Sequence, residues 1–522
     1  MTDFPWLTAT GVVPLVGALV IALLPAAKEQ LAKAVALVTS LVVLGMVVAI
    51  GLAFTPGGGF QFTESVAWIP SFGTRYQLGV DGIALSLLAL VAVLVPVVVL
   101  ASWHDARGGT RPAKTFFALL LVLETTLVGV FAATDVFLFY VFFEAMLVPM
   151  YFIIGSFGGK RRSYAAVKFF LYSLVGGLLM LAAVIGLYVA SAAELGEGTF
   201  DLQVLRTLEL DPVVQRALFL GFFIAFAIKA PLFPFHTWLP DAGAAAPTGG
   251  AVLLVGVLDK VGTFGFIRYC IPLFPEASSY FAPMVIVLSI IGILYGALLA
   301  MGQTDLKRLV AYTSVAHFGF ITLGIFAFTS QAGTGAVLYM VNHGLSTGAL
   351  FLVVGFLVAR RGSARIDEFG GVAKVAPMLA AAFLIAGLSS LALPGTNSFV
   401  SEFLVLLGTF TVNPLAAVVA TLGIILAAMY VLIAYQRTMT GPLRPGLERT
   451  RDLGGREVAV ITPVLALVLV LGVYPRPLLD VITPDVTATY TEAGQTDPVP
   501  TLAGPDAGGP ATATGTTAGS AQ

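Results

Sequence analysis

The sequence predicts an all-α polytopic membrane protein with about fourteen transmembrane helices, because three observations agree. Of the 522 residues, 58% are hydrophobic and only 11% are charged, whereas an ordinary soluble domain is about one-quarter charged. The mean hydropathy is +0.97. Apolar runs of about 20 residues, the length that crosses a bilayer, recur along most of the chain.

The expected helices follow these runs in order. They lie near residues 5–25, 31–53, 80–102, 115–133, 135–155, 165–190, 213–230, 246–270, 281–301, 308–328, 334–358, 376–408, 413–436 and 457–475. Segment 437–483 is expected to hold a loop and the last helix. After Pro484 the chain becomes rich in Thr, Ala, Gly and Pro, with too little apolar surface to pack, so residues 484–522 are expected to form a mobile external tail.

The loops on the two sides of the membrane differ in charge. Of the 27 basic residues, 19 fall in one set of alternate loops and only 4 in the other. Because cytoplasmic loops carry the excess of Lys and Arg, the basic loops are expected in the cytoplasm and both termini outside. The N-terminus lacks the basic region that opens a cleavable signal peptide, so the first helix is expected to be retained.

Several function classes lack support in the sequence. A net charge of −1 without a basic face gives no reason to expect nucleic acid as a partner. The single cysteine, Cys270, excludes an intrachain disulfide and a thiolate-bound iron–sulfur cluster. Neither an HExxH metal motif nor a GxxxxGK(S/T) phosphate loop occurs. Redox and nucleotide chemistry are therefore expected elsewhere.

One stretch, residues 221–248, breaks the rules for a membrane helix. It places Lys229 in an apolar run and follows it with three prolines and His236. A lysine in hydrocarbon costs roughly 2.5 to 3.5 kcal/mol on insertion scales, and each proline frees an upstream carbonyl. Five helices later a Pro-Gly pair at 394–395 interrupts a second apolar run near Glu402. Paired interrupted helices indicate a transport site, and a five-helix offset reverses the second unit in the membrane.

Ionisable side chains recur inside the expected helices, where they are tolerated only if they face the bundle interior, paired or hydrated. They are Glu124, Glu144, Lys168, Lys229, His236, Asp259, Lys260, His317, His343 and Glu402. Such a set suits proton transfer, because a neighbouring carboxylate changes the proton affinity of a buried lysine and histidine titrates near neutrality. Glu144 and Lys229 are expected to form such a pair.

Single members of this set have simpler explanations. Lys168 lies near the cytoplasmic end of its helix, where a lysine can extend its amine to the interface. Asp259 and Lys260 are sequence neighbours that point about 100° apart on a helix, so they need not pair. A lone buried histidine is more often a hydrogen-bonded structural residue than a proton relay. The whole set can also be explained as polar contacts that hold the helices together.

Four motifs, in this order, make the chain resemble the antiporter-like subunits of respiratory complex I. They are FYVFFEAMLVPMYFIIG, KAPLFPFHTWLPDA followed by APT, DLKRLVAYTSVAHFGF and HGLSTGALFLVVG. Within that family, the glutamate of LPGTNSFVSEF, Glu402, resembles the bacterial NuoM type (the mitochondrial ND-four type), whereas the paralogues generally carry lysine there. Fourteen helices without a long lateral C-terminal helix also fit this type and disfavour NuoL.

The resemblance implies two inverted five-helix repeats, helices 4–8 in residues 115–270 and helices 9–13 in residues 281–436, after three N-terminal helices in residues 1–114. Helices 7 and 12 are the broken ones. The family usually continues LPDAH with a polar pair, but here Asp241-Ala242 is followed by Gly243 to Ala245. The resemblance therefore does not extend a proton-entrance role to this loop.

In such subunits a Glu–Lys pair modulates a connecting lysine, which passes protons through two histidines to a terminal residue. The matching positions in this sequence are, in that order, Glu144 with Lys229, Lys260, His317 with His343, and Glu402. The accessory candidates are His236, Lys168, Glu124 and Asp259. No residue of this chain is expected to perform redox chemistry or to bind a metal.

The implied function is proton translocation as a subunit of an NADH:quinone oxidoreductase in a bacterial inner membrane. NADH, FMN, iron–sulfur clusters and quinone are expected in partner subunits and not in this chain. The expected membrane partners are NuoL-like and NuoN-like neighbours and the lateral helix of NuoL, within the lipid bilayer. The alternative is a subunit of a multisubunit sodium/proton antiporter, which shares most of the motifs.

Overall fold

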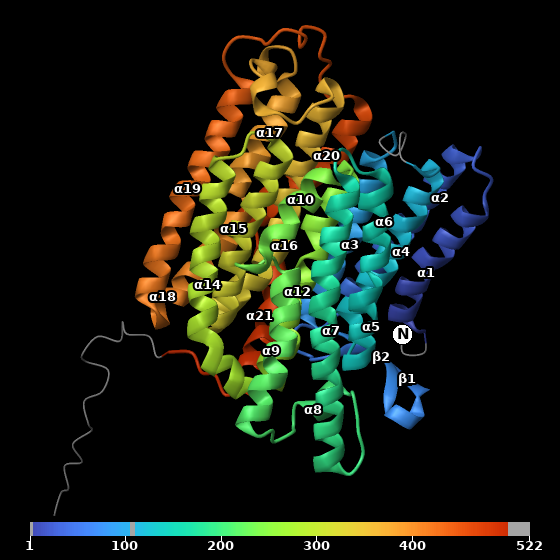
Figure 1. Cartoon of the computed structure of the whole chain (residues 1–522), viewed down its shortest axis with the longest axis vertical. Coiled ribbons are helices and arrows are strands. Elements are labelled where there is room, and N and C mark those ends of the chain that lie inside the picture. The colour runs from blue at the N-terminus through green and yellow to red at the C-terminus, as the bar shows by residue number, and fades with distance from the viewer. Residues whose placement is uncertain (1–3, 105–109, 499–522) are drawn as a thin grey trace, which may run out of the picture.

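The computed structural model describes residues 4–104 and 110–498, and it is a bundle of long helices that run roughly along one axis (Figure 1). Within the described residues, thirteen helices are long and apolar enough to cross a membrane. They are α1 (Trp6–Leu23), α2 (Glu29–Ala53), α3 (Gly82–Ala101), α4 (Ala113–Ala132), α5 with α6 (Val136–Ala145 and Leu147–Phe157), α7 (Arg162–Leu195), α9 (Pro212–Lys229), the span Thr248–Leu273, α14 (Pro275–Met301), α15 (Leu306–Phe326), α16 (Ser330–Arg361), α19 (Pro414–Met439) and α20 (Gly455–Val473).

Shorter elements complete the chain. The span Thr248–Leu273 is made of α11 (Thr248–Leu253), the π-helical turn η3 (Leu254–Leu258), α12 (Lys260–Gly265), the π-helical turn η4 (Phe266–Cys270) and α13 (Ile271–Leu273). The other short helices are α8 (Leu202–Leu205), α10 (Trp238–Ala245), α17 (Pro377–Ser390), α18 (Asn397–Val412), α21 (Arg476–Glu492) and the 3-10 turns η1 (Pro70–Phe72), η2 (Phe235–Thr237), η5 (Ile366–Glu368) and η6 (Val372–Lys374).

The two interrupted helices are confirmed and run in opposite directions. Helix 7 consists of α9 and α10, separated by residues 230–237, and helix 12 consists of α17 and α18, separated by residues 391–396. The latter pair gives the fourteenth crossing. Figure 1 shows α9 low in the bundle and α10 high, whereas α17 lies at the upper end and α18 at the lower end.

The helical fold is confirmed, and a two-stranded antiparallel hairpin is added to it. It pairs β1 (Gln61–Ile69) with β2 (Thr74–Val80), and Gly73 turns the chain with a φ of 63°. The hairpin also caps the first helix, because the Glu64 carboxylate accepts a hydrogen bond from the backbone N–H of Leu7 at 2.7 Å. The polar N-terminus of α1 is thereby satisfied by a side chain from another element.

The predicted start of the tail at Pro484 is wrong, because Pro484 lies inside α21. This helix packs so closely on α3 that a Cβ on Gly82 would lie 1.9 Å from the Val481 carbonyl oxygen. The Asp485 carboxylate accepts the Gly82 N–H at 2.6 Å, and the Tyr490 hydroxyl donates to the Ile325 carbonyl at 2.8 Å. Residues 484–492 therefore belong to the folded body, while residues 499–522 lie outside the described residues.

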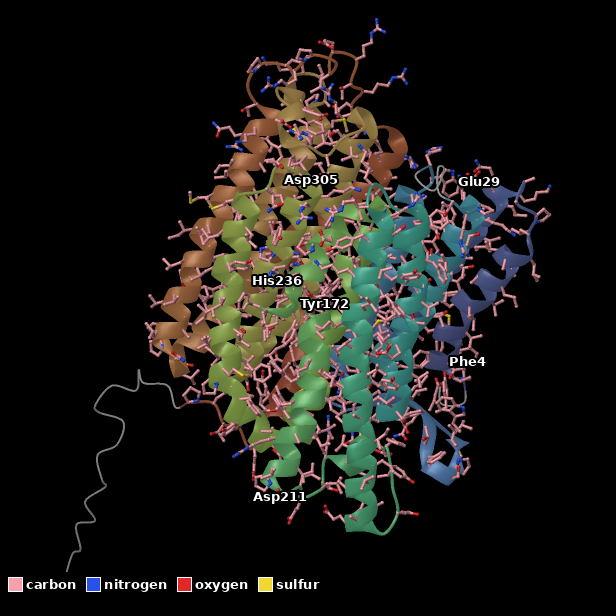
Figure 2. The ribbon with its side chains drawn as sticks, in the orientation of Figure 1. Phe4, Glu29, Tyr172, Asp211, His236 and Asp305 are labelled. Atoms are coloured by element: carbon pink, nitrogen blue, oxygen red, sulfur yellow. The ribbon has the colours of Figure 1, made fainter. Side chains whose placement is uncertain are left out.

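The centre of the bundle is formed by the span Thr248–Leu273, α15 and α16, whose most apolar windows are 94% to 100% buried. Figure 2 shows His236 and Tyr172 at mid-height of the bundle, with Asp211 near its lower end and Asp305 near its upper end. On these central helices Asp259, Lys260, His317 and His343 are at most 4% exposed.

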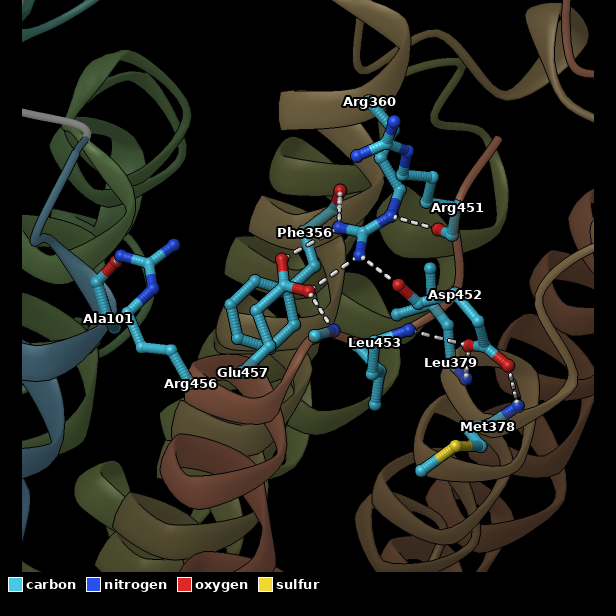
Figure 3. Close-up of polar contacts among 11 residues, drawn as sticks. Ala101, Phe356, Arg360, Met378, Leu379, Arg451, Asp452, Leu453, Arg456 and Glu457 are labelled. Carbon is cyan, nitrogen blue, oxygen red and sulfur yellow. Dashed lines mark hydrogen bonds and ion pairs between the residues drawn. The ribbon is translucent and has the colours of Figure 1, made fainter. Parts of the chain in front are cut away.

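The upper end of helix 12 is fixed by the loop before α20 (Figure 3). The Asp452 carboxylate accepts the backbone N–H groups of Met378 at 2.8 Å and Leu379 at 2.9 Å, which caps the start of α17. Beside it, the Arg360 guanidinium donates to both carboxylate oxygens of Glu457, at 2.8 and 2.6 Å. These contacts tie the ends of α16, α17 and α20 together.

Candidate functional site

Glu144 and Lys229 lie at the ends of two helices that meet inside the membrane. Glu144 is the penultimate residue of α5, where Met146 separates α5 from α6 and Pro149 removes a backbone donor. Lys229 is the last residue of α9 and is buried. Their charges are close enough to interact, but among the described residues nothing hydrogen-bonds to Lys229 Nζ.

The surroundings of this pair set its geometry. Lys229 Nζ lies 4.9 Å from the centroid of the Phe143 ring, a distance at which the ring face attracts a cation. Glu144 fits against α7 only because residue 177 is glycine, since a Cβ there would lie 1.6 Å from Glu144 Oε1. The Glu144 carboxylate therefore occupies space that any side chain at position 177 would fill.

The break after Lys229 is stabilised by a side chain. Pro231 and Pro234 end the regular ladder of α9, and the Trp238 indole N–H donates to the carbonyl of Ile228 at 2.8 Å. This bond replaces the partner that the break removes, so the helix can open beside Lys229 without leaving the Ile228 carbonyl unsatisfied.

Lys260 lies at the centre of the site, two residues after the end of the π-helical turn η3. Its ammonium donates to the carbonyl of Val255 within that turn and lies 3.0 Å from Asp259 Oδ1. The expectation that Asp259 and Lys260 need not pair is therefore overturned, because the wide turn lets both side chains reach one point. π-Helical turns are frequent at functional sites, and this one is held open by the lysine itself.

Two histidines continue from Lys260. Lys260 Nζ lies 2.6 Å from Nδ1 of His343 on α16, so a charged lysine donates a hydrogen bond to it. The rings of His343 and His317 are 5.3 Å apart and nearly perpendicular. On α15, His317 Nε2 lies 3.5 Å from the Tyr430 hydroxyl. Four helices thus contribute to one buried row: α12, α16, α15 and α19.

Glu402 lies on α18 beyond the break of helix 12 and is 5% exposed. Its helix packs against α16, which carries Tyr339, and against α19, which carries Tyr430. The break itself is held by a reciprocal amide pair. Asn342 Nδ2 donates to the Asn397 carbonyl at 2.8 Å, and Asn397 Nδ2 donates to the Asn342 carbonyl at 3.1 Å.

Three accessory candidates lie apart from this row. The His236 ring packs against Phe233 and Tyr295, at centroid distances of 5.9 and 5.5 Å. Lys168 binds the Asp241 carboxylate at 2.8 Å. Glu124 is buried in α4, and no donor in the described part of the chain reaches its oxygens.

Sequence reasoning missed several polar residues. Asp241 binds Arg308 at 2.7 Å as well as Lys168, which joins α10 to α7 and α15. The position of Asp241 in the LPDA motif, just after the break in helix 7, was the feature of the sequence that could have identified it. Tyr339, Tyr430 and Asn397 carry no formal charge, so a search for ionisable residues within apolar runs passes over them.

Comparison with known proteins places the chain in one family. Residues 133–429 match the family model described as NADH:quinone oxidoreductase/Mrp antiporter, TM. NADH-quinone oxidoreductase subunit M of Mycobacterium tuberculosis is 50% identical over 539 aligned positions, covering 97% of each chain.

Two solved structures share the fold. A chain of respiratory complex I from Thermus thermophilus with bound NADH is 33% identical, with a TM-score of 0.85 over 94% of this chain and 100% of that one. A chain of the Mrp complex from Dietzia is 21% identical, with a TM-score of 0.83 over 93% of this chain and 98% of that one, and this second likeness concerns the fold alone. The chain belongs to the family of NADH-quinone oxidoreductase M subunits.

Proposed function

We propose that this chain translocates protons through its buried Glu, Lys and His side chains as the M subunit of an NADH:quinone oxidoreductase. The contact between Lys260 and His343 carries the proposal. Two groups that exchange protons lie 2.6 Å apart in fully buried helices, and His317 follows His343 in ring contact. A purely structural polar contact does not require a second histidine beyond the first.

The Glu144–Lys229 pair is the proposed control point. A carboxylate near a buried lysine favours the charged lysine, so movement or neutralisation of Glu144 changes whether Lys229 holds its proton. Lys229 in turn interacts electrostatically with Asp259, the ion-pair partner of Lys260. A change in the charge of Glu144 or Lys229 can thus alter the electrostatic environment of Lys260.

The energy scale fits this kind of switching. Moving one charge against a membrane potential costs about 2.3 kcal/mol per 100 mV, and a shift of one pKa unit corresponds to about 1.4 kcal/mol. Changes of one or two units at a few coupled groups are therefore enough to drive a proton forward.

The protons would move while partner subunits oxidise NADH and reduce quinone, and those partners would hold the FMN, the iron–sulfur clusters and the quinone. We propose NuoL-like and NuoN-like proteins as membrane neighbours and the lateral helix of NuoL as a further contact. The sequence motifs and the relatives' names support this assembly.

We further propose that the protein lies in the bacterial plasma membrane with both termini outside, and that residues 115–270 and 281–436 are inverted repeats. The excess of basic residues at the opposite end of the bundle from the N-terminus supports the orientation. The opposite directions of the interrupted helices 7 and 12 support the repeats.

The proposal is tested by Lys229→Ala, Glu144→Ala and Glu402→Ala in the intact complex. Each is expected to impair proton pumping and the coupled quinone reduction while the complex still assembles. Lys28→Ala, which changes an exposed lysine, serves as the control and should pump normally. Normal pumping in all three buried-site variants would refute the proposal. Reduced assembly with unaltered pumping per assembled complex would indicate that these residues only stabilise the packing of the helices.

The alternative is a subunit of a multisubunit sodium/proton antiporter, because the matching family model covers both groups. Purification of the protein with its partners separates the two functions. Flavin and iron–sulfur absorbance in the co-purified complex is expected for the oxidoreductase. A complex without those chromophores would favour the antiporter.

A further inference from the structure

The outward face of α19 carries a groove that ends near a basic pocket. Figure 1 shows α19 at the outer edge of the bundle. The groove has a volume of about 510 Å³ and runs between two rows of side chains, because residues four apart form ridges on a helix surface. One row contains Ile424, Ala428 and Leu432, and the other contains Ile425, Met429 and Ile433.

The groove has about the length of one bilayer leaflet. It extends from Ile424 to Gln436, which is about 18 Å along a helix that rises about 1.5 Å per residue. Half of a hydrocarbon core about 30 Å thick is about 15 Å. The groove lies in the half of α19 that leads to Arg437 and the basic loop after it. An acyl chain of the leaflet on that side therefore fits along the groove.

A second cavity, of about 360 Å³, lies at this end of α19 and is lined in part by Arg437 and Arg444. Both arginines are exposed, and within the described residues neither forms an ion pair. The carboxylate in the lining, that of Asp367, already binds Arg365 at 2.6 Å. The pocket therefore presents two guanidinium groups to an anion at the membrane surface.

Backbone contacts hold Arg444 at the pocket. Its N–H donates to the Gly370 carbonyl at 3.2 Å, and the Gly371 N–H donates to the Thr440 carbonyl at 2.8 Å. Gly371 has a φ of 65°, and a Cβ there would lie 2.7 Å from the Leu443 nitrogen. The loop after α19 is thus packed tightly against the segment that contributes Asp367.

We propose that the groove and the pocket together bind one anionic phospholipid, with its phosphate between Arg437 and Arg444 and an acyl chain along α19. The planar guanidinium of arginine matches the geometry of phosphate oxygens, and basic pockets between membrane helices bind anionic headgroups. The groove is apolar within the leaflet and the pocket is basic at the surface, which is the order of chain and headgroup in a lipid. An apolar partner helix would fill the groove but leave both arginines without an anion. This lipid site is separate from the proton path and does not depend on the proposed function.

Photo-cross-linking in the intact complex identifies what covers the groove. Ile425, which is 59% exposed, is replaced by benzoylphenylalanine, and the complex is placed in vesicles with equal amounts of phosphatidylglycerol and phosphatidylcholine. Mass spectrometry is expected to show phosphatidylglycerol adducts favoured by about 5-fold or more, because one basic residue at the surface favours an anionic lipid by about 1 kcal/mol. The same probe at Leu415, which is 74% exposed at the opposite end of α19, should show no preference.

Arg437→Gln combined with Arg444→Gln should abolish the preference at position 425. The control is Arg449→Gln, which changes an exposed arginine of the same loop outside the pocket lining and should preserve it. Equal labelling of the two lipids when all three arginines are present, or a preference that survives the double substitution, would overturn the proposal. Cross-links to a protein subunit in place of lipid would show that a partner covers α19 and would overturn it as well.

A second measurement needs no photoreactive residue and remains decisive if the probe prevents assembly. Ala428→Phe fills the groove, whereas Val418→Phe enlarges a side chain of α19 that is 58% exposed and lies outside the groove. A ligand that binds the folded state raises its stability, so phosphatidylglycerol added to the delipidated complex should raise the thermal midpoint. The rise is expected to be smaller for Ala428→Phe than for Val418→Phe and the wild type. An equal rise in all three would contradict the proposal.

Discussion

Gly177→Ala tests how the Glu144 carboxylate is positioned. The added Cβ would lie 1.6 Å from Oε1 and 2.5 Å from Cδ of Glu144, whereas ordinary contacts begin at 3.4 Å. The carboxylate must therefore retreat by about 2 Å, and in catalytic geometry a misplacement of about 1 Å can already cost roughly 100-fold. We expect a large loss of proton pumping in an assembled complex.

The design separates this clash from a general helix effect. Alanine is favoured over glycine within a helix by about 0.8 to 1 kcal/mol, so the substitution should not weaken α7 itself. Gly45→Ala is the matched control, because its added methyl would meet no atom within 4 Å. Proton uptake and NADH oxidation are measured in vesicles for both variants. Normal pumping by Gly177→Ala, in a preparation where Glu144→Ala is impaired, would refute the claim that pumping depends on the position of the Glu144 carboxylate beside Gly177.

Three further predictions concern the central lysine, the helix contact beside it and the C-terminal helix α21. Lys260→Met keeps the length of the side chain but removes its hydrogen bonds, so proton uptake per NADH should fall in an assembled complex. Gly262→Ala places a Cβ 2.4 Å from the backbone nitrogen of Ala230, and such overpacking costs about 1 to 3 kcal/mol, which should lower the thermal midpoint of the purified complex. Burial, followed by the neighbouring Asp81 carboxylate, raises the pKa of Asp485 to about 6 from 3.8. Folded Asp485 therefore keeps its proton longer than the unfolded residue, so the docking of α21 should weaken as pH rises from about 4 to about 6; hydrogen exchange of α21 should show this, and Asp485→Asn should abolish it.

The number of crossings and the two breaks could be predicted because they depend on local features. The length of each apolar run sets a span, and the prolines at 231, 234 and 394 cannot continue a helical ladder. The hairpin at residues 61–80 was missed because its strands, of nine and seven residues, are too short to span a membrane and lie between two longer apolar runs, where they resemble a connecting loop.

The pairing of Asp259 with Lys260 could not be predicted from the sequence. The angle of about 100° between neighbours holds for a regular α-helix, whereas these two residues follow a π-helical turn. That turn is stabilised by the Lys260 side chain on the Val255 carbonyl, a contact that exists only in the folded bundle.

The row from Lys260 to Tyr430 also depends on tertiary packing. The ionisable members were visible as charges or imidazoles within apolar runs. Their order in space could not be read from the sequence, because it differs from their order along the chain. His343 on α16 lies between Lys260 on α12 and His317 on α15. Tyr430 carries no formal charge, and only its position beside His317 distinguishes it from the tyrosines that fill space elsewhere.

The most direct test of the central claim is the number of protons taken up per NADH oxidised by vesicles that contain the Lys229→Ala complex. It is measured beside the wild-type complex at matched rates of NADH oxidation. If the buried row carries protons under the control of Glu144 and Lys229, the variant takes up fewer protons per NADH. An assembled Lys229→Ala complex with the wild-type ratio would contradict the account.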